Sequence, residues 1–360
     1  YIVKFMTRKI VFTTLVLFMI VSLSGCISFN SKKTTSTSNL GGVFLSVDKA
    51  DAWKHRSLLM TPGQQAGSIS DTDVYFLRFD PTNTKVMYAG TKKNGLYVSY
   101  NAGAGWQKVE SLPSGFIRDL VIDSKDHCTL YGAVHNRVYK SIDCGREWAS
   151  IWYSDSSEKV VAALGMDWYD PNVVYAGLSD GTVLKSTNKG ATWTKSYKFE
   201  QRVNKIVVDP NDSRTVYAGV LNEGLFRTDD KGENWVSLNA AMKDFRRSSN
   251  FYDFDVSKSS KNEVVYASQY GLLRSKDKGE TWTEIELNSS AGEEKIFSVA
   301  IDPSNVNYIY YGTDTALYKT VDAGATWAVK RMPTTKVAGE LLVYPEDSKN
   351  IFMGVKTFVK

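Results

Sequence analysis

The stretch DPNDSRTVYAGVLNEGLFRTDDKGENW, residues 209–235, decides the fold. It contains Asp-Pro at 209–210, Tyr-Ala-Gly at 217–219 and a closing phrase Thr-x-Asp-x-Gly-x-x-Trp at 228–235. Runs of alternating apolar residues indicate strands, and the Gly, Asn and Asp residues between them indicate tight turns. The sequence predicts one four-stranded unit here, with strands at Val203–Asp209, Thr215–Val220, Gly224–Arg227 and Asn234–Leu238.

The closing phrase, Ser/Thr-x-Asp/Asn-x-Gly-x-x-Trp, occurs six times, and its successive Trp residues lie 42 to 47 positions apart. This period matches a four-stranded propeller blade. The Asp or Asn side chain is expected to accept hydrogen bonds from backbone N–H groups of its own turn, while the Gly adopts a left-handed conformation. We therefore predict structural roles for six positions, which are Asn101, Asp143, Asn188, Asp230, Asp277 and Asp322.

The two ends of the repeat region each contain half of a unit. Leu341–Val355 resembles the first two strands of a blade, and no closing phrase follows. Gly42–Trp53 resembles the last two strands with a degenerate closing phrase between them. Joining the halves would close the ring and remove exposed sheet edges. We therefore predict an all-β fold, a single seven-bladed β-propeller over residues 41–360; a six-bladed ring with extra terminal strands is the rival.

The first 26 residues have the pattern of a bacterial export signal. The basic pair Arg8-Lys9 precedes an apolar run, Ile10–Leu23, of about 14 residues, which is short for a membrane span of about 20. The segment ends Leu-Ser-Gly-Cys at Cys26, which resembles a lipobox. That resemblance implies a signal peptide over 1–25 and lipidation of Cys26. Residues 26–40 are expected to form a polar, flexible tether to the membrane.

Charge and cysteine content restrict the ligands. Without residues 1–25 the chain has 41 basic and 39 acidic residues, a balance of +2 that offers no case for nucleic-acid binding. The three histidines, His55, His127 and His135, lack zinc-site spacing, so we expect no metal and no cofactor. Export and the register counted from the turn at 135–136 predict a disulfide between Cys128 and Cys144; two separate thiols are the alternative.

These repeats resemble those of the BNR/Asp-box propeller superfamily over residues 41–360, and we call the closing phrase the Asp box from here on. The phrasing is most similar to the photosystem II assembly factor family or to one half of a xyloglucanase. The resemblance implies the fold but is poor support for any one function. It implies either a binding or assembly scaffold, or a secreted glycoside hydrolase related to xyloglucanases or sialidases.

A hydrolase needs specific groups that can be sought in the sequence. An inverting enzyme needs two carboxyl groups across one cleft, and Asp119 and Asp253, at matching first-strand positions, are the one weak candidate pair. A sialidase needs three arginines around its substrate. Arg78, Arg118 and Arg202 lie near first strands but without recognisable partners, and the Arg-Ile-Pro phrase typical of sialidases does not occur.

Binding is expected on the propeller face opposite the Asp boxes, because loops there vary between repeats. Two connections are long, His55–Asp73 and Asn239–Ser249, and the second contains Lys243, Arg246 and Arg247. Arg is favoured at interfaces, although a solvated loop is the plainer interpretation. We expect a monomer in the cell envelope, at the outer membrane or cell surface, that binds an envelope protein or glycan.

Overall fold

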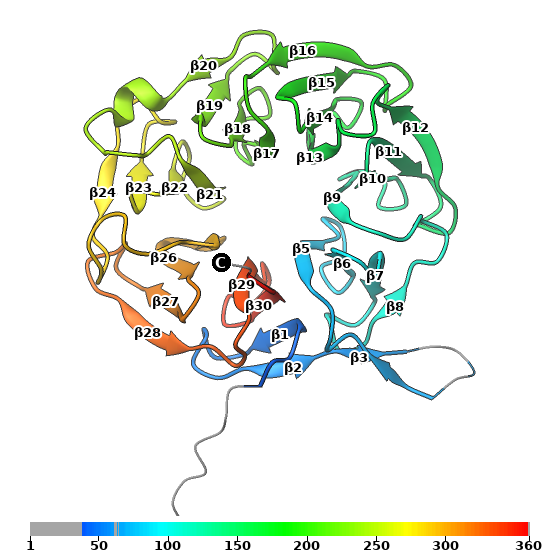
Figure 1. Ribbon diagram of the computed structural model, residues 1–360, viewed down its shortest axis with the longest axis horizontal. Helices are drawn as coiled ribbons and strands as arrows, with labels where there is room; N and C mark the ends of the chain where they lie inside the picture. Colours follow the sequence, from blue (N-terminus) through cyan, green and yellow to red (C-terminus); the bar gives the residue numbers. More distant parts are fainter. Residues whose placement is uncertain (1–37, 61–62, 64, 359–360) are drawn as a thin grey trace, which may run out of the picture. The chain divides into compact units, whose positions relative to one another are not determined.

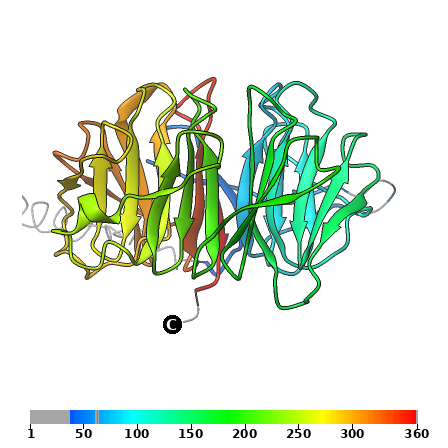
Figure 2. The same cartoon turned by 90° about the horizontal axis from the view of Figure 1, so that it is seen from above.

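The computed structural model describes residues 38–60, 63 and 65–358. Within them seven four-stranded antiparallel sheets are arranged as blades around a central axis, with strands that run roughly along it (Figures 1 and 2). The expected signal peptide, Cys26 and most of the tether lie outside the described residues. In the described part, no helix is long and apolar enough to cross a membrane.

Each blade contributes strands A to D from the axis outward, as the order around Figure 1 shows. Blades 1 to 3 comprise β5 (Val74–Phe79), β6 (Met87–Thr91), β7 (Leu96–Ser99), β8 (Gln107–Lys108); β9 (Ile117–Ile122), β10 (Leu130–Val134), β11 (Arg137–Ser141), β12 (Ala149–Tyr153); and β13 (Val161–Met166), β14 (Val174–Leu178), β15 (Thr182–Ser186), β16 (Thr194–Lys198). Blades 4 to 6 comprise β17 (Val203–Val208), β18 (Val216–Val220), β19 (Gly224–Thr228), β20 (Val236–Ser237); β21 (Phe251–Val256), β22 (Val264–Ser268), β23 (Leu272–Ser275), β24 (Thr283–Ile285); and β25 (Ser298–Asp302), β26 (Asn305–Gly312), β27 (Ala316–Thr320), β28 (Ala328–Arg331).

The seventh blade is shared by both ends of the repeat region, which confirms the predicted closure. Its strands, in spatial order from the axis, are β29 (Val337–Val343), β30 (Ile351–Lys356), β1 (Gly42–Ser46) and β2 (Lys54–Arg56). β1 and β30 pair antiparallel from Gly42 opposite Val355 to Ser46 opposite Ile351. Strand A of this blade starts four residues before the predicted Leu341, and strand D follows Trp53 instead of ending there.

Two connections contain regular structure that the sequence pattern did not indicate. The connection His55–Asp73 includes a small hairpin, β3 (Leu58–Leu59) and β4 (Gly67–Ser68), and Leu59 bridges to Trp106 of blade 1. The connection Asn239–Ser249 begins with a short 3-10 helix, η2 (Asn239–Met242). Burial of Met242 in the core of blades 4 and 5 accounts for this local fold.

The Asp boxes act as self-contained turns between strands C and D. In all six, the Ser or Thr hydroxyl accepts a hydrogen bond from the box glycine N–H at 2.7–3.0 Å. The residue before that glycine also has positive φ, between 52° and 63°, so the left-handed segment is longer than the predicted single glycine. The degenerate box of blade 7 keeps the pattern, with Ala50 N–H donating to the Ser46 hydroxyl at 2.8 Å.

The Tyr-Ala-Gly phrase of strand B is explained by packing between blades. A Cβ atom added at Gly219 of β18 would lie 2.3 Å from Cζ of Phe251 in strand A of the next blade. The same close approach occurs at Gly177 against Val203 and at Gly354 against Val74. In these three blades, glycine therefore lets strand A of the following blade seat its apolar side chain against strand B.

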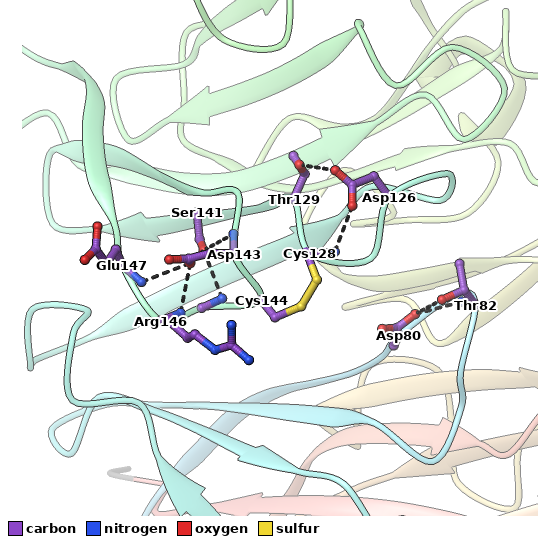
Figure 3. The surroundings of a disulfide bond; sticks show 11 residues. Asp80, Thr82, Asp126, Cys128, Thr129, Ser141, Asp143, Cys144, Arg146 and Glu147 are labelled. Carbon is purple, nitrogen blue, oxygen red and sulfur yellow. Dashed lines mark hydrogen bonds between the residues drawn. A yellow bond between two sulfur atoms is a disulfide. The ribbon is translucent and has the colours of Figure 1, made fainter.

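A disulfide links Cys128 and Cys144 within blade 2, with the two Cα atoms 3.8 Å apart (Figure 3). The predicted register is confirmed, since Val134 lies opposite Arg137 and Tyr131 opposite Lys140. Cys144 occupies the box position where blades 3 and 4 have lysines that bind a buried aspartate of the preceding blade, as in the 3.1 Å pair of Lys189 with Asp123. Blade 2 has, at this box position, a disulfide within the blade where blades 3 and 4 have an ion pair to the preceding blade.

We predict that replacing both cysteines by serine lowers the free energy of unfolding by about 3 kcal/mol, because the bond closes a loop with a sequence separation of 16. Urea denaturation of the purified chain measures the change. Reducing agent should lower the stability of the native chain by a similar amount and leave the double variant unchanged. Equal stability of the variant and the native chain would contradict the prediction.

Candidate functional site

A ring of β-bulges surrounds the axial cavity. In six blades strand A has a register shift against strand B that leaves one residue unpaired, the second of the strand in five blades and the third in β29. Bulges turn a side chain away from the regular alternation and often occur near functional sites. All six residues line one cavity of about 320 Å³, namely Tyr75, Arg118, Ala162, Asn204, Tyr252 and Gly339. The repeat thus presents residues of differing size and charge to the cavity, from Gly339 to Arg118.

The cavity lies toward one face of the ring. Because strands alternate in direction, the A–B turns and the Asp boxes share one face, which we call the Asp-box face. The B–C turns and the D–A connections share the other, which we call the loop face. The bulges are at the start of strand A, on the loop-face side. In Figure 1, the strands that contain these residues, β5, β9, β13, β17, β21 and β29, are nearest the axis.

Ion pairs between first strands join the blades, on the Asp-box side of the bulges. The Arg78 guanidinium binds Asp119 at 2.9 Å and Glu340 at 2.8 Å, so it joins blades 1, 2 and 7. Burial alone would lower the pKa of Arg78, but these two carboxylates raise it above its ordinary value. Burial raises the pKa of Glu340, which Arg78 only partly offsets. Lys205 binds Asp253 at 2.8 Å in the same way between blades 4 and 5.

We predict that Arg78→Met lowers the free energy of unfolding by about 3 kcal/mol at pH 8, since it leaves the Asp119 and Glu340 carboxylates without their shared cation. A carboxyl group whose pKa is raised on folding binds protons more readily in the folded state, so its unfavourable contribution decreases as the pH falls. The deficit should therefore be smaller at pH 5 than at pH 8 in chemical denaturation. Arg78→Lys, which keeps the charge, is the control; a pH-independent deficit would contradict the mechanism.

Two further hollows continue from the cavity across the loop face. The middle hollow, of about 470 Å³, shares Tyr252, Phe297 and Lys356 with the cavity and adds Lys295. The outer hollow, of about 350 Å³, shares Gln269 with the middle one and is lined by six other residues, Arg246, Arg247, Tyr270, Ala291, Gly292 and Glu293. We call the cavity and these two hollows together the basic groove.

The cations of the basic groove contact aromatic rings more often than carboxylates. The Arg118 guanidinium carbon lies 4.1 Å from the ring centroid of Phe116, and the Lys356 ammonium lies 4.9 Å from that of Tyr75. Lys295 lies 4.7 Å from the ring centroid of Phe358. Among the described residues, none of these three cations, nor Arg246 or Arg247, forms a salt bridge. The groove is therefore positively charged and aromatic.

Comparison with known proteins supports the repeat assignment. The family model described as photosynthesis system II assembly factor YCF48 matches residues 209–342. The chain resembles the crystal structure of the GH74 xyloglucanase from Xanthomonas campestris, with a TM-score of 0.63 and 19% identity over 79% of this chain and 51% of that one. The chain is a BNR-type β-propeller.

Two other similarities of this BNR-type propeller differ in how much of the relative's length they cover. The structure described as YCF48 bound to D1 peptide matches with a TM-score of 0.59 and 11% identity, over 79% of this chain and 93% of that one. A xyloglucanase of Paenibacillus is 28% identical over 43% of this chain, but the match covers only 13% of that protein. The propeller thus spans a small part of the curated relatives that it matches, and the relatives include both an enzyme and a non-enzyme type.

The candidate carboxylates Asp119 and Asp253 both lie in the wall of the central cavity, but each has structural partners. Asp119 binds Arg78 with one oxygen and accepts the Leu164 N–H of the next blade with the other at 3.0 Å. Asp253 binds Lys205 and accepts the Val299 N–H at 2.9 Å. These carboxylates join blades, which accounts for their matching positions in the repeat.

The three arginines considered for a sialidase all line the central cavity, where they differ in their contacts. Arg78 has two carboxylate partners, which the sequence did not indicate. Arg118 and Arg202 have none among the described residues, and the Nε atom of each is buried without a hydrogen bond. Aligning the first strands of the repeats would have found Arg118 at the bulge position, because Ile117 before it keeps the apolar position that opens strand A in other blades.

The three predicted binding residues of the long connection are exposed on the loop face. Arg246 and Arg247 line the outer hollow, whereas Lys243 follows η2 and does not line it. In the described part of the chain, one cluster has metal-ligand chemistry, His127 with Cys128 and Cys144. The disulfide joins its two sulfur atoms, so the cluster as it stands does not offer two thiolates.

Proposed function

We propose that this protein is a membrane-tethered, extracytoplasmic scaffold that binds a protein partner through the loop face of its propeller. The observation that carries the proposal is the basic groove, a series of three hollows that adjoin through shared lining residues, from the central cavity to Arg246 and Arg247. Its exposed arginines and aromatic rings are residues that protein interfaces favour. Acidic segments of a partner would gain both steering and pairing from such a groove.

Two comparisons support a protein partner. The YCF48-type family model covers residues 209–342, which include the connection with Arg246 and Arg247 and the walls of the outer hollow. A solved relative of that type has been described in complex with a D1 peptide. Transferring a peptide-binding role to this chain is our inference, and it concerns a polypeptide ligand in general, not that particular one.

We infer binding, not glycoside hydrolysis, from the ion pairs and hydrogen bonds that the cavity carboxylates already make. A hydrolase needs one carboxyl group that donates a proton and one that activates water or attacks the sugar. Asp119, Asp253 and Glu340 each bind a cationic side chain, and two of them also accept backbone N–H groups of the next blade. Release of reducing sugar from xyloglucan by the purified chain would contradict this part of the proposal.

The membrane tether is part of the proposal because of the lipobox-like Leu-Ser-Gly-Cys ending at Cys26. Lipid chains on Cys26 would hold the propeller near the membrane, and the polar segment after it would let the loop face reach a partner in the same envelope. A membrane protein with an acidic segment on the same side of the membrane is the class of partner that this arrangement suits.

Affinity capture from envelope extract tests the proposal. The native chain should retain a partner, and the triple variant Lys243→Glu, Arg246→Glu, Arg247→Glu should retain about tenfold less, because reversal of three exposed charges replaces attraction by repulsion. A matched variant reverses three exposed charges of the Asp-box face, Arg146→Glu, Lys258→Glu and Lys276→Glu, and should bind like the native chain. Equal loss in both variants would place the binding elsewhere.

A further inference from the structure

Two half-buried arginines in the central cavity have no anionic partner in the described part of the chain. The Nε atoms of Arg118 and Arg202 are buried and make no hydrogen bond, and neither side chain forms a salt bridge with a described residue. By contrast, Arg78 and Lys205 of the same cavity have carboxylate partners within 2.9 Å. Buried charged groups are normally paired, because desolvation of an unpaired ion is costly. This cavity therefore contains an unbalanced positive charge.

The two arginines act on each other across the cavity. Burial, and after it the positive charge of Arg202, lower the pKa of Arg118 to about 10. Burial likewise lowers the pKa of Arg202. Lys356, a third cation of the cavity wall, also has a pKa lowered by burial. A ligand that brought a negative charge between these groups would relieve the repulsion and restore the missing hydrogen bonds.

The aromatic residues and the volume of the cavity restrict the size and shape of the rest of the ligand. Phe116 holds the Arg118 guanidinium on one side and contacts Tyr75 edge to face, with ring centroids 4.3 Å apart. Tyr252 and Phe297 line the same cavity, whose volume of about 320 Å³ suits a small molecule or the end of a chain. Flat rings and planar guanidinium groups together suit a planar anionic group on a compact body.

The carboxylates that line the cavity favour a ligand with a single negative charge. Five cationic and three anionic side chains line the cavity, which leaves a surplus of two positive charges. Asp119 and Glu340 would repel the second charge of a phosphate dianion, whereas they could accept hydrogen bonds from hydroxyl or amide groups of the ligand. A carboxylate has one charge and two oxygens in the plane that an arginine fork recognises.

We propose that the central cavity is a carboxylate-binding site in which Arg118 and Arg202 hold the carboxylate of a small acid or of a chain end against the aromatic wall. The proposal does not depend on partner binding at the outer hollow, because it uses neither Arg246 nor Arg247. The carboxylate could belong to a sugar acid or to the C-terminus of a polypeptide. The two sources share the recognition chemistry and are separated below.

Titration calorimetry of the full chain in detergent tests the site with four kinds of probe. These are D-glucuronate against neutral D-glucose, a tetrapeptide with a free C-terminus against its C-terminal amide, acetate, and sulfate. We expect glucuronate or the free peptide to bind, and glucose and the amide not to bind. The tighter of the two binding probes identifies the source. The double variant Arg118→Gln, Arg202→Gln should weaken binding by about tenfold or more, because each lost contact is a charge-assisted hydrogen bond.

Thermal unfolding provides a second measurement that does not depend on the choice of source. Without ligand, the double variant should unfold no earlier than the native chain, because it removes two half-buried charges that have no carboxylate partner among the described residues. Added glucuronate or free peptide should raise the midpoint of the native chain only. The triple variant at Lys243, Arg246 and Arg247 is the control and should bind the small acids like the native chain, which separates this site from partner binding.

Three results would overturn the proposal. They are no binding of any carboxylate at tens of millimolar, undiminished binding by the folded double variant, and binding of sulfate without any carboxylate. The third would indicate a general anion site. Loss of partner capture in the triple variant with intact carboxylate binding would leave both proposals standing, and loss of carboxylate binding alone in Arg118→Gln, Arg202→Gln would support this one specifically.

Discussion

A chain that ends at Asp347, and so lacks β30, is expected to lose its cooperative fold. β30 is the central strand between β29 and β1 and pairs with both along its length. Four of its side chains, Ile351, Phe352, Met353 and Val355, are at most 1% exposed. Burial of an apolar side chain contributes about 1.5–3 kcal/mol, so their loss is comparable with the total stability of a typical domain. Without β30, β1 and β2 would also have no partner in the ring.

Circular dichroism during heating and gel filtration measure the outcome. The truncated chain should show no cooperative transition and should elute as an expanded or aggregated species. A chain that ends at Phe358 is the matched control, because it keeps β30 and the contact of Phe358 with Phe297, and it should melt like the native chain. A cooperative transition within a few degrees of the native midpoint in the shorter chain would contradict closure through the shared blade.

Cys26→Ser is expected to move the protein from the membrane fraction to the supernatant. The proposed anchor needs the Cys26 thiol as the lipid acceptor, and lipid chains supply membrane affinity that the polar residues after it do not. Fractionation with an alkaline wash and metabolic labelling with palmitate measure the two steps. The double Cys128→Ser, Cys144→Ser variant is the control and should stay in the membrane fraction with its label. Unchanged sedimentation of Cys26→Ser would refute the anchor.

The features that could be predicted from the sequence are local ones. The Asp boxes are turns in which side chains and backbone of neighbouring residues satisfy each other, so the same letters give the same turn in six blades. The register of β10 and β11 followed from a tight turn at His135 and Asn136, which also placed Cys128 beside Cys144. Closure followed from two incomplete repeat units whose missing halves are complementary.

The features that could not be predicted depend on contacts between blades. Asp119 is 41 residues from Arg78 and 45 from Leu164, and only the ring geometry brings these groups together. A repeated acid in strand A therefore looked like a candidate for catalysis when its role is to join blades. The bulges are another case, because a shift of one residue against strand B reverses which side chains face the axis. For that reason the sequence pattern did not place Arg118 in a cavity.

The basic groove was predicted in part. Arg246 and Arg247 were identified from the length and charge of the connection Asn239–Ser249, and the structure places both at the outer hollow. The inner half, with Lys295, Lys356, Arg118 and Arg202, comes from four different blades or connections whose residues have no common pattern in the sequence. Such a surface depends on the ring closing with the right number of blades.

In-cell photo-crosslinking tests the central claim, which is that the loop face binds the partner. A photoreactive residue in place of Ala291, an exposed residue of the outer hollow, should crosslink a specific protein in intact cells. The same residue in place of Ala325, exposed in the Asp box of blade 6, is the matched control and should give no such product. The account predicts a crosslink from Ala291 that the triple charge reversal removes. The same product from Ala325, or a product from Ala325 alone, would contradict it.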